Sequence, residues 1–327
     1  MTNLTQKLDG FTIIFTSIIL EAIPFVLIGA IVSSFIQLFV SEKTIQSLLP
    51  KNKYVAIIGA SFMGIIFPVC ECAIIPIMRR LVKKGVPLDV AITFMLSVPI
   101  LNPIVLLSTY YAFTGQPSMV LYRGILGAFG AIIIGLIVGR LNHRNVLKIS
   151  ATNFEPSCCT NHNHEEHLDQ EEHHHECTQD TVHIRIGVNQ TKRKILSSII
   201  DHTSHEFFEV GRFLIIGAFL SALMQTLLPR TTLMAIGKGP INSIIVLMLL
   251  AFVLSICSEA DAFIARTFVG QFTQGSIVAF LIFGPMLDIK NMIMLSATFK
   301  AKFLLKLVTV ITIVCFLLAL MVNIIIG

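Results

Sequence analysis

Eight stretches of the chain, each about 20 residues or longer and nearly free of charge, constrain the fold more than any other feature. An apolar helix of about 20 residues can cross a hydrocarbon core of roughly 30 Å while satisfying its own backbone hydrogen bonds. The stretches therefore predict an all-α, polytopic protein of the cell membrane. They cover residues 11–40, 54–78, 86–113, 118–139, 207–228, 240–265, 275–299 and 303–326.

The overall composition agrees with a membrane protein. Hydrophobic residues make up 54% of the chain and charged residues 13%, whereas a soluble domain carries roughly 25% charge. The net charge of +5 comes mostly from the connecting loops, which favours a role in topology and not in nucleic-acid binding. The chain has no G-x-x-x-x-G-K-[ST] motif, so we do not expect an ATP-driven motor. We also expect a protein that is not an enzyme and requires no cofactor.

The stretches form two groups of four on either side of a long polar segment, which indicates duplication. We predict a first membrane repeat at 1–139, a cytoplasmic linker rich in His and Cys at 140–206, and a second membrane repeat at 207–327. Five residues recur at every fourth position in the first stretch and again 188 positions later in the fifth: Glu21, Phe25, Gly29, Ser33 and Gln37, then Glu209, Phe213, Gly217, Ser221 and Gln225.

The positive charges leave open whether the two repeats are parallel or inverted. The loops "RRLVKK" (79–84) and 140–148 are cytoplasmic by the positive-inside rule. If all eight stretches cross the membrane once, seven Lys or Arg residues become external; if the second and sixth stretches are re-entrant or broken, the number falls to four. The second arrangement inverts the halves and is the one we favour.

Prolines predict breaks in the helices at two motifs. Pro68 and Pro76 bracket the P-x-C-E-C stretch, and Pro99 and Pro103 bracket the end of S-x-P-x-x-N-P. A proline removes one backbone donor and clashes with the preceding turn, so each bracket should kink or unwind a helix. Freed backbone groups cannot face lipid, and transporters place substrate sites at such breaks.

Acidic residues at these breaks are the main candidates for a transport site. Glu71 is the only charge between Tyr54 and Met78, and a carboxylate at membrane depth should face the protein interior. The alternative is that each acid is a structural partner of Arg212, Lys290 or Lys306. We expect one central cavity lined by Cys70, Glu71, Cys72, Asn102, Cys257, Glu259, Asp261, Asp288, Glu21 and Glu209.

The thiols in this set suggest the kind of cargo. Cys70 and Cys72 can share a ligand only where the backbone is not helical, because residues two apart on a helix point roughly 200° apart. Thiolates select soft species such as Cu(I), zinc or trivalent arsenic. Cys257 is equally well read as a ligand or as packing, and Cys315 as a small apolar filler.

The segment "CCTNHNHEEHLDQEEHHHECTQDTVH" (158–183) holds seven of the ten histidines and three of the seven cysteines. Imidazole and thiolate are ligands of zinc and other transition metals, so this tract should bind such metals with loose geometry. Its composition also fits a solvated acidic linker with incidental histidines. The candidate ligands are Cys158, Cys159, His162, His164, His167, His173, His174, His175 and Cys177.

Residues 67–113, with "CSEADAFIARTF" and "FLIFGPMLDIKNMIML" in the second half, resemble the predicted permeases of the YraQ type, which include the ArsP organoarsenical efflux permeases. The resemblance covers nearly all of the membrane portion. It implies an inner-membrane permease of about eight helices, and ArsP members export trivalent methylated arsenicals. The family motif maps onto Cys70, Glu71, Cys72, Pro99, Asn102 and Pro103, with Glu259, Asp261, Pro285 and Asp288 in the second half.

We therefore expect a multi-pass secondary permease, embedded in the lipid bilayer, that moves a soft metal, metalloid or organometalloid species. Export follows from the resemblance alone. The His-rich linker departs from what an arsenical exporter requires and favours an alternative: a metal-handling subunit or divalent-metal (zinc) transporter acting with a partner protein. A thiol oxidoreductase using Cys70 and Cys72 is a third reading, for which C-x-C spacing is a poor match.

Overall fold

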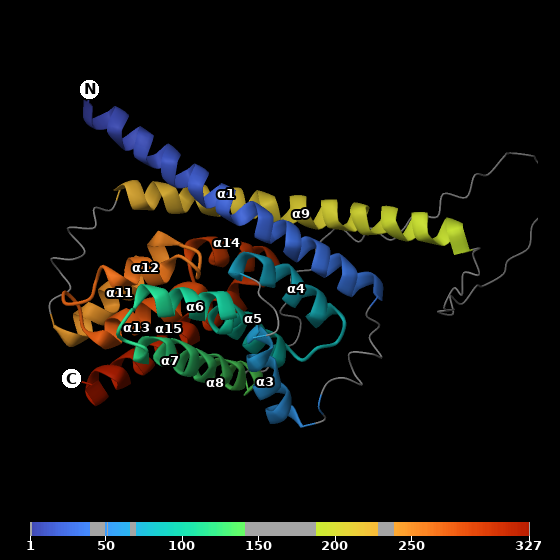
Figure 1. Cartoon of the computed structure of the whole chain (residues 1–327). Helices are drawn as coiled ribbons and strands as arrows, with labels where there is room; N and C mark the ends of the chain where they lie inside the picture. Colours follow the sequence, from blue (N-terminus) through green and yellow to red (C-terminus); the bar gives the residue numbers. More distant parts are fainter. Residues whose placement is uncertain are drawn as a thin grey trace, which may run out of the picture. The chain divides into compact units, whose positions relative to one another are not determined.

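The computed structural model describes residues 2–39, 50, 52–65, 70–140, 188–227 and 239–326. Residues 1–148 and 199–327 form one compact unit, and residues 149–198 form a second, whose described part is the helical start of α9. In chain order (Figure 1) the helical elements are α1 (Thr2–Phe39), α3 (Lys53–Phe62), η1 (Met63–Ile65), α4 (Glu71–Lys83), α5 (Leu88–Leu101), α6 (Pro103–Ala112), α7 (Ser118–Leu121), η2 (Tyr122–Leu126), α8 (Gly127–Arg140), α9 (Val188–Leu227), α11 (Pro240–Leu254), α12 (Asp261–Arg266), α13 (Gln274–Met286), α14 (Ile289–Thr298) and α15 (Ala301–Ile326).

Six helical segments within the described residues are long and apolar enough to cross a membrane. This confirms the expected all-α polytopic fold. The second and sixth predicted stretches contain only shorter apolar helices, Lys53–Ile65 and Pro240–Leu254. The inverted arrangement of the halves, and the two-repeat division itself, stay predictions. The six spans are Leu8–Ile36, Leu88–Ala112, Ser118–Arg140, Ile199–Leu227, Gln274–Thr298 and Ala301–Ile325.

The second and sixth stretches are each interrupted in the middle. In the second, η1 ends at Ile65 and α4 begins at Glu71, with residues 66–69, including Pro68, outside the described part. In the sixth, α11 ends at Leu254 and α12 begins at Asp261. The end of α11 is marked by Ser255 in the left-handed region, with φ 46°, a conformation that terminates helices.

Two of the membrane-crossing helices are also broken, at Asn102 and at Asp288. The Asn102 side chain accepts a hydrogen bond from the Ile104 backbone N–H at 3.0 Å and so caps the start of α6. Asp288 caps α14 in the same way, accepting from the Asn291 N–H at 2.6 Å. Polar caps satisfy donors that a broken helix exposes, so each break carries its own capping residue.

Interruptions lie within both proline brackets, as expected: at Cys70, between Pro68 and Pro76, and at Asn102, between Pro99 and Pro103. Most of the prolines are nevertheless not the break points themselves. Helix α4 continues through Pro76, α5 through Pro99 and α13 through Pro285. Among the prolines that the structure describes in these motifs, Pro103 stands at a break, as the first residue of α6, where its missing N–H costs nothing. Pro99 and Pro285 lie at the C-terminal ends of their helices, whereas Pro76 lies in the middle of α4.

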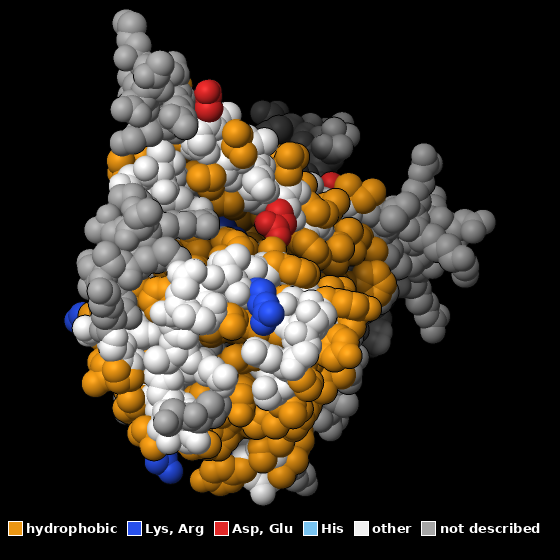
Figure 2. Space-filling view, turned by 60° about the vertical axis from the view of Figure 1, so that its left-hand side comes forward, with side chains coloured by type: hydrophobic (Ala, Val, Ile, Leu, Met, Phe, Trp, Pro, Cys, Tyr) orange, Lys and Arg blue, Asp and Glu red, His pale blue; other side chains and the backbone are white. Residues whose placement is uncertain are grey.

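The broken crossings lie inside the protein and the unbroken ones outside. In the apolar part of each span, 78% of the residues are buried in α5–α6 and 83% in α13–α14, against 17–33% in the other four spans. Apolar side chains cover much of the outer face in Figure 2, with few charges among them. This is the distribution expected when lipid surrounds a bundle that shields its irregular backbone.

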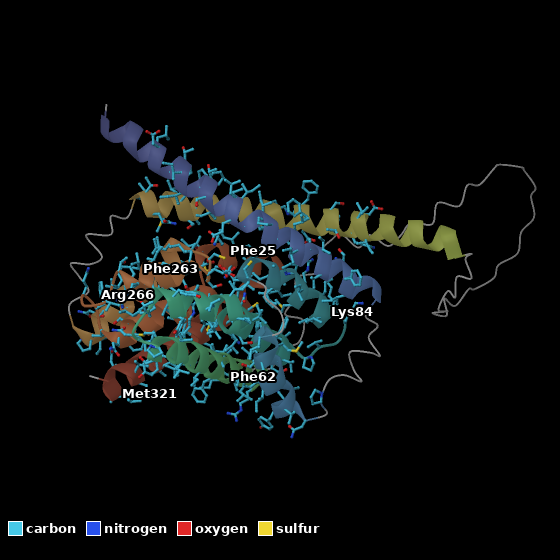
Figure 3. The ribbon with its side chains drawn as sticks, viewed as in Figure 1. Phe25, Phe62, Lys84, Phe263, Arg266 and Met321 are labelled. Carbon is cyan, nitrogen blue, oxygen red and sulfur yellow. The ribbon has the colours of Figure 1, made fainter. Side chains whose placement is uncertain are left out.

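Glycines allow two long helices to approach this centre closely. A Cβ added to Gly29 of α1 would lie 2.6 Å from the Ala73 Cβ of α4, and one added to Gly217 of α9 would lie 3.0 Å from the Lys290 Cα. At the far end of α4, Lys84 Nζ donates to the Ile36 carbonyl at 2.6 Å (Figure 3). The repeated Gly29 and Gly217 thus pack against the elements that follow breaks.

Helix α9 also satisfies the broken end of α11. Ser221 Oγ donates to the Val253 carbonyl at 3.1 Å, and Gln225 Nε2 donates to the Leu254 carbonyl at 2.8 Å. The last carbonyls of any helix lack intrahelical donors. These two members of the repeated four-residue pattern therefore stabilise a helix end within the membrane region.

Replacing Gly29 with alanine should destabilise the protein. The new methyl group has no room against Ala73, and overpacking of this kind costs about 1–3 kcal/mol. Gly59→Ala is the matched control, because a Cβ there meets nothing within 4 Å. We expect a lower melting temperature in detergent for Gly29→Ala and an equal or higher one for Gly59→Ala; equal melting temperatures for the two variants would contradict the close packing.

Candidate functional site

The two interrupted stretches bring cysteines from separate halves of the chain together. Cys70 precedes α4 in an extended conformation, with φ −78° and ψ 170°, and Cys257 lies in the non-helical segment between α11 and α12. The Cys70 thiol interacts with the thiols of both Cys72 and Cys257. Because Cys70 lies outside the helix, the condition for Cys70 and Cys72 to approach one another is met.

Carboxylates extend this line of thiols. Cys257 Sγ donates to Glu259 Oε2 at 2.7 Å, and Cys257 also interacts with Glu21 on α1. All three thiols are buried and free, whereas Glu259 is half-buried and Glu21 is exposed at the side of its helix. The thiols are therefore in the buried part of this group, and Glu259 and Glu21 are its more exposed members.

Glu71 is the innermost acid of the site. Its side chain is buried, and Oε2 accepts a hydrogen bond from Ser258 Oγ at 3.1 Å across the two breaks. Oε1 has no hydrogen-bond partner among the described residues and lines a small cavity, as does Asn291, whose Oδ1 also lacks one. The expected placement of Glu71 in the protein interior is thus what the structure has.

One lysine supplies positive charge to this group of acids. Lys290 is buried in the first turn of α14, and its Nζ lies 3.8 Å from Asp288 Oδ2. It interacts electrostatically with Glu71, Cys72 and Glu21 as well. The Ile289 N–H donates a hydrogen bond to Ser255 Oγ at 3.0 Å. This bond joins the α13–α14 break to the α11–α12 break. The site thus contains portions of three interrupted helices.

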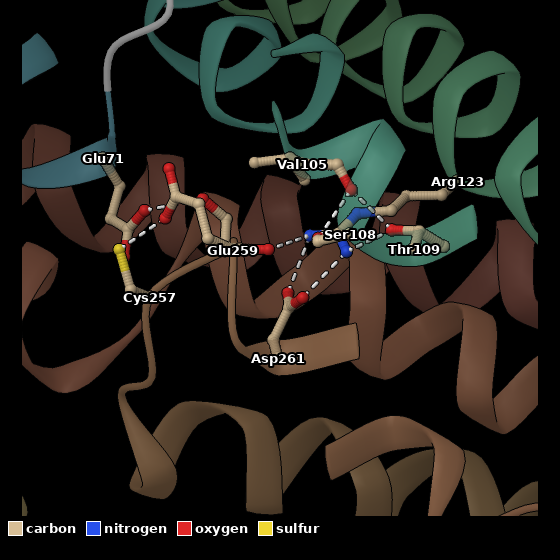
Figure 4. A network of polar contacts seen from close by, with 9 residues as sticks. Glu71, Val105, Ser108, Thr109, Arg123, Cys257, Glu259 and Asp261 are labelled. Atoms are coloured by element: carbon tan, nitrogen blue, oxygen red, sulfur yellow. Dashed lines mark hydrogen bonds and ion pairs between the residues drawn. The ribbon is translucent and has the colours of Figure 1, made fainter. Parts of the chain in front are cut away.

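Asp261 takes part in a buried ion pair that the sequence analysis did not anticipate. Its two carboxylate oxygens accept from Arg123 NH1 and NH2 at 2.7 and 2.8 Å (Figure 4). Arg123 is fully buried in the π-helical turn η2. It is the only charged residue between positions 118 and 139, and a lone charge in an apolar span is a functional signal. That signal was present in the sequence and overlooked.

Two other predicted site residues lie apart from the thiols. Glu209 on α9 forms an ion pair with Arg79 on α4, 2.6 Å from NH1 to Oε1, with both side chains partly buried. Asn102 is buried and caps α6, as described above, and no contact joins it to the thiols. The structure therefore brings together Cys70, Glu71, Cys72, Cys257, Glu259, Asp288 and Glu21, with Asp261 connected through Arg123.

Metal binding is predicted for the linker, and the described part of the chain can be searched for metal ligands as well. Within the described ranges, no group of three or more His, Cys, Asp or Glu side chains is arranged to hold a metal ion. The predicted linker ligands, Cys158 to Cys177, all lie outside the described residues. Metal binding by the linker thus stays a prediction.

Comparisons with known proteins agree with this membrane architecture. A family model described as "Predicted permease" (ArsP_1) matches residues 7–324. The chain is 46% identical over 302 residues to "UPF0718 protein YcgR" of Bacillus subtilis (strain 168), covering 92% of each chain. It is 40% identical over 299 residues to a protein of Streptococcus mutans serotype c (strain ATCC 700610 / UA159), covering 90% of this chain and 89% of that protein.

The Streptococcus protein is named "Putative two-component membrane permease complex subunit". No solved structure matches the chain. The family match spans nearly the whole sequence and favours a transport protein over an enzyme. The chain is a multi-pass cell-membrane protein and belongs to the ArsP_1 family of predicted permeases.

Proposed function

We propose that this chain is a secondary permease that exports a soft metal, metalloid or organometalloid species. The observation that carries the proposal is that two interrupted stretches interact at the buried carboxylate of Glu71: Ser258 Oγ donates to it at 3.1 Å, and the neighbouring Cys257 interacts with Cys70. Thiolates prefer soft cargo, and non-helical backbone at membrane depth is where transporters bind substrate.

The chemistry of a trivalent organometalloid suits a pair of thiols. Each sulfur–metalloid bond forms as a thiol gives up its proton and the metalloid gives up a hydroxide, which leave together as water. A neighbouring carboxylate such as Glu71 or Glu259 can take the thiol proton transiently, since proton transfer needs a group within hydrogen-bonding reach. Glu259 accepts from Cys257 at 2.7 Å. The acids would thus relay protons, and the thiols would make brief contacts with the cargo.

A second candidate is a metal-handling subunit or divalent-metal (zinc) transporter that acts with a partner protein. Two observations favour it. One is the His- and Cys-rich tract at 158–183. The other is the name of the Streptococcus relative, which describes that protein as a putative subunit of a two-component membrane permease complex. Purified protein in liposomes separates the candidates. A permease gives counterflow by itself, and a subunit gives none until its partner is added.

Three substitutions should abolish transport while leaving the protein in the membrane: Cys70→Ser, Glu71→Gln and Asp288→Asn. Each removes a thiol or a charge from the site but keeps the side-chain size. We expect transport in everted vesicles to fall to background, measured for trivalent methylarsenical and for zinc side by side.

The control for these variants is Cys315→Ser. Cys315 is buried on α15, where its sulfur lies 3.7 Å from that of Met286, and no hydrogen bond or ion pair joins it to the thiols and acids of the site among the described residues. This variant should transport like the parent. Full activity in all three site variants would reject the assignment of the site. The cargo itself is named by deleting the protein in its host and comparing sensitivity to arsenicals, antimonials, zinc, copper and cadmium.

The linker should bind metal without being needed for transport. Replacing every Cys and His between positions 158 and 177 by serine removes all nine candidate ligands. Equilibrium dialysis of the purified protein against zinc should show lost binding, while vesicle transport stays at the parental rate. Unchanged zinc binding would favour the reading of an incidental, solvated linker; lost transport would place the tract in the transport path.

A further inference from the structure

The guanidinium of Arg123 joins three parts of the chain. It makes the bidentate pair with Asp261 at the start of α12 and donates to the Ser258 carbonyl at 3.1 Å. It also donates to Thr109 Oγ1, on α6, at 2.9 Å. The contacts reach from η2 to the segment between α11 and α12 and to the helix that follows the Asn102 break (Figure 4).

The contact with Ser258 leads directly to the thiols and acids. Ser258 stands between Cys257 and Glu259, and its own hydroxyl donates to Glu71 at 3.1 Å. When Arg123 holds the carbonyl of Ser258, the orientation of that peptide group also orients the side chain of Ser258 and those of its two neighbours. A single peptide group therefore connects Arg123 to the candidate site.

The segment 255–260 has little internal structure to hold it in place. Its turn is closed by hydrogen bonds from the Ala260 and Asp261 N–H groups to the Cys257 carbonyl, at 3.0 and 3.1 Å. Groups outside the segment must fix its remaining carbonyls, and Arg123 fixes that of Ser258. Arginine suits this task because its planar fork can bind a carboxylate with two nitrogens and still donate to further acceptors.

The location of Arg123 supports a role beyond stability. It is fully buried, and it lies in a π-helical turn, Tyr122–Leu126. Single π turns within α-helices are frequent at functional sites. A buried ion pair is weak grounds for stability, because well-packed apolar residues often replace one without loss.

We propose that Arg123 is a positioning residue of the permease site, holding the 255–260 segment so that Cys257, Ser258 and Glu259 face Cys70 and Glu71. It contacts no cargo itself. The proposal rests on the proposed function only in taking these residues as the site. Its test measures the position of the thiols directly and requires no cargo, so its failure is distinguishable from failure of the transport assignment.

The test measures how fast Cys70 and Cys257 can be joined. The parent variant keeps these two cysteines, replaces the other five by serine, and carries a protease cleavage site between positions 158 and 183. Diamide oxidises the two thiols to a disulfide and is itself reduced to the hydrazine. After proteolysis, the two halves stay together on a non-reducing gel only where the disulfide has formed.

Two variants remove the positioning contacts in different ways. Arg123→Lys keeps the charge but cannot reach Asp261 and the Ser258 carbonyl with the same fork. Arg123→Met combined with Asp261→Asn removes both charges, so no buried charge is left unpaired to block folding. We expect both to reach the membrane and to slow cross-linking by about fivefold or more, the change that follows from losing roughly one hydrogen bond to a charged group.

The matched control is Arg79→Lys, which alters another ion pair between the halves, with Glu209, that does not contact the 255–260 segment. It should cross-link at the parental rate. A parental rate in the double variant would overturn the proposal and leave the ion pair a purely structural link. Absence of cross-linking in the parent would overturn it too, since the thiol contact would not exist. If Arg123→Lys fails to accumulate, the double variant decides alone.

Discussion

Backbone hydrogen bonds that a helix break leaves unmade cannot be supplied by lipid, and this constraint organises the protein around its interruptions. Side chains of the protein supply hydrogen bonds at three of these helix ends. Asn102 and Asp288 cap the helices that follow them, and Ser221 and Gln225 donate to the last carbonyls of α11. The broken crossings are accordingly the buried ones, and the unbroken helices surround them.

The polar groups needed at the breaks bring charge into the bundle, and the charges are arranged in two groups. In one, Arg123 and Asp261 form a close bidentate pair with full geometric complementarity. In the other, Lys290 lies 3.8 Å from Asp288, and Glu71 retains an oxygen with no partner among the described residues. A tightly paired group is suited to holding structure. A loosely paired one is suited to exchanging protons or a cation.

The sequence was sufficient for the architecture and for the centre of the site, and insufficient for the pairing of charges. Apolar length predicts the crossings, and the proline-bracketed motifs predict the interruptions at Cys70 and Asn102. Which acid meets which cation depends on helix rotation and on contacts between distant segments. Glu209 pairs with Arg79 of another helix, and no local pattern could indicate it. The proline brackets indicate where the helices are interrupted but not the exact residue, because α4 continues through Pro76 and α5 through Pro99.

A permease must hold its cargo firmly enough to bind and loosely enough to release it, and the arrangement at Cys70 and Cys257 is suited to that balance. The two thiols come from segments that precede different helices, so a small displacement of either segment separates them. Binding through both would then depend on the relative position of the two halves of the chain. Cys72, only two residues along from Cys70, cannot give this dependence, because both belong to one turn. On the proposed function, the thiols that come from different halves are therefore the ones that couple cargo release to a change in conformation.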